Sequence, residues 1–171
     1  MKVFSSQYFD ELLYSANQSQ RLRAHANVHR SYADQCQKLF NAIKVNSYIR
    51  PHRHSLDPKE ECLIAIKGLF GLIVFTEQGI IESITFFGSE KYSEKFSTVS
   101  GLELPAGAWH TVISLVDDSI LFEVKNGPFD LSIAKELAPW APEEGGKNAA
   151  QYLETLKQKC FSKLLKIQIK D

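Results

Sequence analysis

Between residues 37 and 125 the chain is a succession of short apolar or alternating segments separated by turn residues, and this succession limits the possible folds most strongly. Glu77-Gln78-Gly79 is a hairpin turn, and Asp117-Asp118 is a second turn. Many short strands with regular turns predict a mainly β protein, built as a sandwich or an antiparallel barrel. The expected strands are 37–44, 48–54, 62–67, 71–76, 80–87, 101–105, 111–115 and 120–125.

Different patterns flank these strands. Residues 6–17 predict a helix, with Ser6 as its cap and one apolar stripe, and residues 21–29 alternate as a half-buried strand does. Residues 129–167 predict an extended, proline-punctuated arm followed by a helix over 147–166. We therefore expect one domain over residues 1–171, with a barrel core over about 21–128.

Composition narrows the classes of partner. The 171 residues include 20 basic and 20 acidic side chains, and this neutrality argues against nucleic acid. No segment is apolar enough for a membrane span and no signal peptide is evident, so we expect a cytoplasmic protein that binds a small molecule or another protein. Cys36, Cys62 and Cys160 are odd in number and widely spaced, so we expect free, buried or half-buried cysteines.

Three of the five histidines lie in two short segments, Pro51-His52-Arg53-His54 and Pro105 to His110. Residues two apart on a strand point to the same face, so His52 and His54 are expected to converge while Arg53 points away. Pro105 and Gly107 form a turn that would bring His110 to the pair. Three imidazoles predict a site for one divalent transition metal. The pair His52 and His54 alone would be explained as well by exposed histidines that bind nothing.

A carboxylate is expected to complete this site. Glu61 is the better candidate, because its neighbour Glu60 would point to the opposite face of the strand. Three nitrogens and one oxygen suit iron, manganese, nickel or zinc equally, and the sequence does not choose among them.

Two further groups of side chains are candidates for binding or catalysis. Glu123 and Lys125 alternate with apolar residues, and they are either catalytic groups inside the barrel or a solvated strand edge. Trp109 is expected to pack, and Trp140 to anchor the arm. A polar wall for a carboxylate or phosphate substrate, or else an outer sheet face, is predicted at Arg21, Arg23, His25, Asn27 and Arg50.

These motifs resemble those of the cupin superfamily, in the order His52, His54, Glu61 and Gly68, followed by Pro105, Gly107 and His110. The interval from His54 to Glu61 is longer than usual, and Asn46 stands where a glycine is common. The flanking segments 21–29, 48–54, 122–130 and 135–142 are similar to those of the WbuC-type cupin-fold metalloproteins of bacteria.

The resemblance implies a double-stranded β-helix that holds a metal and commonly forms a homodimer. It does not imply a reaction, although some members are encoded among surface-polysaccharide genes. Two hypotheses follow. The protein is a metal-dependent enzyme that acts on a small oxygen-bearing substrate, of carboxylate or sugar type, or it is a non-catalytic sugar- or small-molecule-binding module with a structural metal.

Overall fold

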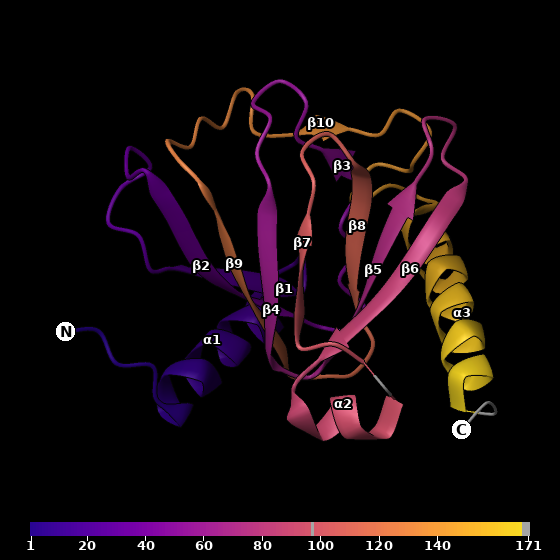
Figure 1. Cartoon of the computed structure of the whole chain (residues 1–171), viewed down its shortest axis with the longest axis horizontal. Coiled ribbons are helices and arrows are strands. Elements are labelled where there is room, and N and C mark those ends of the chain that lie inside the picture. The colour runs from indigo at the N-terminus through magenta and orange to yellow at the C-terminus, as the bar shows by residue number, and fades with distance from the viewer. Residues whose placement is uncertain (97, 169–171) are drawn as a thin grey trace.

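Two antiparallel five-stranded sheets face each other and form a barrel, as the computed structural model shows (Figure 1). The structure describes residues 1–96 and 98–168. One sheet has the order β1 (Arg23–Asn27), β2 (Cys36–Ile43), β9 (Ser119–Asn126), β4 (Glu61–Lys67) and β7 (Gly101–Leu104). The other has the order β10 (Glu136–Leu137), β3 (His52–Arg53), β8 (Trp109–Ser114), β5 (Leu69–Phe75) and β6 (Ile81–Gly88). The helices are α1 (Ser6–Gln18), α2 (Glu90–Phe96) and α3 (Ala149–Gln168).

Alternate residues of each strand point into the barrel, and at one end of the barrel these inward-facing residues are apolar. In β5, Phe70 and Leu72 pack inside against Ile43 of β2 and Leu63 of β4. The alternate residues Leu69, Ile73 and Phe75 face the opposite side and join a separate core. This double burial explains why β5 is apolar along its whole length.

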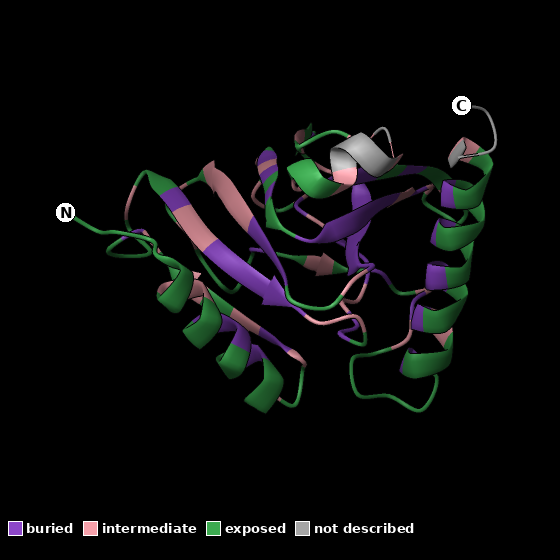
Figure 2. Ribbon diagram, turned by 90° about the horizontal axis from the view of Figure 1, so that it is seen from below, coloured by how far each residue is buried: buried purple, intermediate pink, exposed green. Residues whose placement is uncertain are grey.

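The two long helices cover the outer faces of the sheets (Figure 2). The apolar stripe of α1 packs on Phe40 and Ile120 of the first sheet. The buried side of α3, which includes Leu153 and Leu156, packs on Ile73 of the second sheet. The mainly β fold with an N-terminal helix and a C-terminal helical arm is thus confirmed.

Several local expectations need correction. The cap of α1 is Ser5, whose side chain accepts a hydrogen bond from the Tyr8 backbone N–H. The strand expected over 48–54 is only His52–Arg53, since Pro51 has no N–H to donate to a ladder. The strand expected over 21–29 begins at Arg23, because Leu22 has a positive φ of 53° that interrupts extended backbone. Neither α2 nor β10 was expected.

The expectations for the cysteines and the tryptophans are confirmed, with one exception. All three cysteines are free, but Cys36 at the start of β2 is exposed, contrary to expectation. Trp140 anchors the arm to the barrel, with its ring 5.0 Å from that of Phe75, and Trp109 is buried by packing. No helix in the described part of the chain is long and apolar enough to cross a membrane.

Candidate functional site

The polar end of the barrel is built by the same alternation that builds its core. Along β9, Phe122 faces outward toward α1, so Glu123 and Lys125 face inward. Along β4, Glu61 shares the inner face with Leu63. The structure therefore resolves the two placements of Glu123 and Lys125: they line the interior and are not a solvated edge. Their catalytic role stays a prediction.

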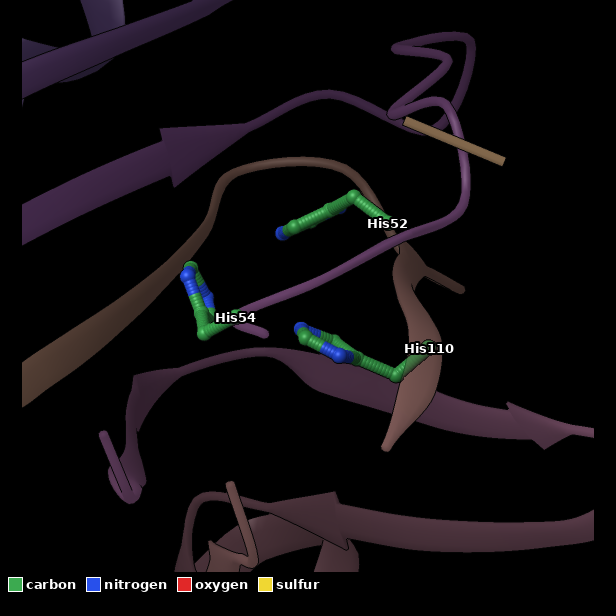
Figure 3. Close-up of side chains that lie close together, drawn as sticks. All are labelled: His52, His54 and His110. Atoms are coloured by element: carbon green, nitrogen blue, oxygen red, sulfur yellow. The ribbon is translucent and has the colours of Figure 1, made fainter. Parts of the chain in front are cut away.

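His52, His54 and His110 converge at this polar end (Figure 3). His52 of β3 lies directly opposite His110 of β8, and their ring centroids are 4.4 Å apart. One ligand atom from each of the three rings lies within 4.8 Å of the others, and all three side chains are buried. On the other face of the same strand pair, the Arg53 guanidinium lies 4.3 Å from the centre of the Trp109 ring.

Backbone carbonyls fix the orientation of each imidazole. The Nδ1 atoms of His52 and His110 lie 3.0 and 2.9 Å from the carbonyl oxygens of Arg50 and Ala108, and Nδ1 of His54 contacts the Ala134 carbonyl. A carbonyl oxygen only accepts hydrogen bonds, so each Nδ1 must carry the proton. In the neutral rings the lone pair is then on Nε2, as in metal-binding histidines.

Glu61 lies beside two of these rings. Its Oε1 is 3.0 Å from Nε2 of His54 and its Oε2 is 3.5 Å from Nε2 of His110. Lys125 donates to Oε1 at 2.9 Å and to Glu123 at 2.7 Å. Burial opposes ionisation of Glu61, but the contacts with His110 and His54 and the charge of Lys125 lower the pKa of this carboxyl well below its ordinary value.

These contacts fit a bound cation. Burial, aided by the charge of Lys135, lowers the pKa of His52 well below its ordinary value, so this ring is neutral. Nε2 of His54 is buried and makes no aligned hydrogen bond, although a carboxylate oxygen is 3.0 Å away. Two electron-rich atoms at that distance need a proton or a cation between them. Donors that bind one ion at about 2.1 Å and at right angles lie about 3.0 Å apart, so a divalent metal suits this arrangement.

A cavity of about 710 Å³ opens beside His52. It is large enough for a drug-sized ligand. All the residues predicted as the polar wall line it, namely Arg21, Arg23, His25, Asn27 and Arg50. His25 lines the cavity, and although the residue is exposed, desolvation of its ring, followed by the charges of Lys135, Arg23, Arg21 and Lys125, lowers its pKa to about 4, so this ring is neutral near pH 7.

Three of the predicted wall residues hold the C-terminal arm in place. Arg23 is buried and binds both carboxylate oxygens of Glu144 at 2.7 Å, while Arg21 reaches the same carboxylate at 3.0 Å. Arg50 donates to the Ala138 carbonyl at 2.8 and 3.2 Å. These arginines are already paired with the arm, and their proposed substrate contacts stay a prediction.

Replacing Glu144 with glutamine is expected to lower the free energy of unfolding by about 2–3 kcal/mol. The buried Arg23 would lose its charged partner, and breaking a fully buried pair costs about 3–5 kcal/mol, less here because the Glu144 side chain is 31% exposed. Urea denaturation measures the change. Glu143→Gln is the matched control, because Glu143 is 85% exposed and 4.0 Å from Arg50. Equal losses in the two variants would contradict the proposed role of this ion pair.

Three residues of this region were not predicted from the sequence. Glu144 lies in the arm, more than 90 positions from its partners, and no local pattern marks it. Lys135 lines the cavity next to Ala134, whose carbonyl orients His54. Asn41 is buried with its Oδ1 unpaired. The alternation of Leu39, Asn41 and Ile43 along β2 could have identified Asn41, because it places a polar side chain on an apolar face.

Comparisons with known proteins support the fold. A family described as a domain of unknown function (DUF6016) matches residues 4–86, just under half of the chain. A crystal structure of a Shewanella oneidensis protein is similar, with a TM-score of 0.50 and 12% identity over 66% of this chain and 72% of that one. No curated protein matches.

Two further structures are similar at slightly lower scores. KdgF from Halomonas sp. has a TM-score of 0.47 and 11% identity, over 63% of this chain and 82% of its own. A cupin 2 conserved barrel domain protein from Rhodopseudomonas palustris has a TM-score of 0.47 and 14% identity, over 67% and 66%. The fold is a barrel of two antiparallel sheets, and His52, His54 and His110 inside it can hold a metal ion.

Proposed function

We propose that this protein is a metal-dependent enzyme of the cupin superfamily that acts on a small oxygen-bearing substrate of carboxylate or sugar type. His52, His54, His110 and Glu61 would hold one divalent ion: iron, manganese, nickel or zinc. The observation that carries the proposal is the set of three buried imidazoles, each with its Nδ1 on a backbone carbonyl, beside a buried carboxylate and an open cavity.

Each side chain has a distinct part in this proposal. The ion, when bound, would supply a Lewis acid for an oxygen of the substrate. The carbonyls of Arg50, Ala108 and Ala134 hold the rings in the tautomer that leaves Nε2 free. Lys125 donates to both Glu61 and Glu123, and its charge helps to lower the pKa of the Glu61 carboxyl. Glu123 lines the cavity and would accept a proton from the substrate.

Three narrower expectations belong to the same proposal. The protein would be of the WbuC type, would form a homodimer and would act in the cytoplasm, and the resemblance links it to surface-polysaccharide biosynthesis. The matching flanking segments 21–29 and 135–142 support the first of these. Size-exclusion chromatography with light scattering tests the second, since a single mass of about 19.4 kDa would exclude the dimer.

The experiment that tests the function begins with protein purified without a histidine tag. Elemental analysis should find about one transition metal ion per chain, and failure to hold any metal after reconstitution would overturn the proposal. Protein loaded with Fe(II), Mn(II) or Zn(II) is then assayed with and without oxygen on carboxylates, diketones and nucleotide sugars. Product formation supports an enzyme, whereas thermal stabilisation by one of these compounds without product indicates the binding module instead.

A further inference from the structure

Almost every cation that lines the large cavity already has a partner. Arg21 and Arg23 share Glu144, and Arg50 binds the Ala138 carbonyl. Lys125 bridges Glu61 and Glu123. Lys135 differs, because it has no hydrogen bond or ion pair with any residue that the structure describes. Its ammonium is therefore available to a ligand.

Lys135 also lies where a ligand of the metal site would be. It lines the large cavity and also a small one beneath it, which is bounded by His52, Glu61 and His110. Lys135 is exposed, and desolvation of its ammonium lowers the pKa of this side chain, an effect that Glu123 and Glu61 oppose. An ammonium at this position, without a partner among the described residues, can donate to an anion beside it.

The rest of the cavity suits an apolar group. Leu131 and Leu137 line it and remain 83% and 50% exposed, and Leu39 and Phe129 line the same space. When an apolar part of a ligand covers such exposed side chains, the apolar surface removed from water stabilises the complex. Asn41 Oδ1 is buried without a partner where the two cavities meet, so it can accept a hydrogen bond from a ligand hydroxyl.

The geometry points to a substrate class that rests on the proposed function and narrows it: a carboxylic acid with an apolar portion, whose carboxylate binds Lys135 beside the metal site. The apolar portion lies along Leu39, Phe129, Leu131 and Leu137. Lys135 thereby selects anions, and the leucines select length. The volume of about 710 Å³ leaves room for an acid well above the size of a two-carbon substrate.

Calorimetric titration of the zinc-loaded protein with butanoate, hexanoate, octanoate and 1-octanol tests this assignment. Affinity should rise by up to about fourfold for each added methylene, and octanoate should bind more tightly than octanol. Lys135→Met should weaken octanoate binding at least about tenfold and leave octanol unchanged, and Lys135→Arg should restore part of the loss. Lys147→Met is the matched control, because Lys147 is exposed and outside the cavity.

Two outcomes would overturn the assignment. One is a Lys135→Met variant with normal zinc content that binds octanoate as the original protein does. The other is an affinity that does not change with chain length. Repeating the octanoate titration on chelator-treated protein separates this inference from the proposed function. If the protein holds no metal, the proposed function fails, while a Lys135-dependent preference for octanoate would still support the inference.

Discussion

Alanine at His52 or His110 is expected to abolish stoichiometric metal binding. Each substitution removes one of three nitrogens that the barrel brings within 4.8 Å of one another. Two nitrogens and one carboxylate hold a divalent ion far less tightly, and we expect affinity to fall by about two orders of magnitude or more. Metal content per chain after gel filtration measures the loss. The same variants should lose the rise in melting temperature that zinc gives the original protein.

His25→Ala and His29→Ala are the controls for this result. Both histidines line the same cavity, but neither belongs to the converging group among the described residues. They should keep about one ion per chain. Full metal content in both His52→Ala and His110→Ala would show that the ion binds elsewhere and that the proposed centre is wrong.

Phe70→Ala is expected to produce the largest loss of stability, about 3–5 kcal/mol in the free energy of unfolding. Phe70 is fully buried in the barrel interior and stacks on Phe87, with 5.1 Å between the ring centroids. Removing the ring leaves a cavity between two sheets that cannot close without moving strand backbones. Denaturation in urea measures the change through the transition midpoint and its slope.

Phe161→Ala in α3 is the matched control, because that ring is 43% exposed. Its loss should stay below about 1 kcal/mol. If the two variants lost the same free energy, the packing between the sheets would not be the main source of stability at this position.

Much of the fold follows from local patterns. The period of two along β9 and the apolar stripe of α1 each require one face to be buried, and the continuous apolar run of β5 fits burial on both faces. Local patterns did not predict α2 or β10. The β10 strand has two residues and exists only because β3 lies beside it, so its formation depends on a tertiary contact.

The histidines of the candidate metal site could also be predicted from local patterns. His52 and His54 share a face by spacing alone, and the sequence could indicate that His110 follows a turn that begins at Pro105. Gly107, with φ of +79°, supplies the backbone conformation of that turn. The sequence could not reveal the carbonyls that orient the rings, because Ala134 lies 80 positions from His54 and any residue type offers a carbonyl.

The sequence by itself determined a mainly β fold of short strands and the shared face of His52 and His54, because alternation and turn chemistry act over a few residues. Only the tertiary structure decided which charges are free to bind a ligand. Arg21 and Arg23 appear available in the sequence, yet Glu144 neutralises them, while Lys135 gave no signal and remains unpaired among the described residues. Whether a charge is paired depends on contacts between distant segments, and those contacts exist only after the arm has packed against the barrel.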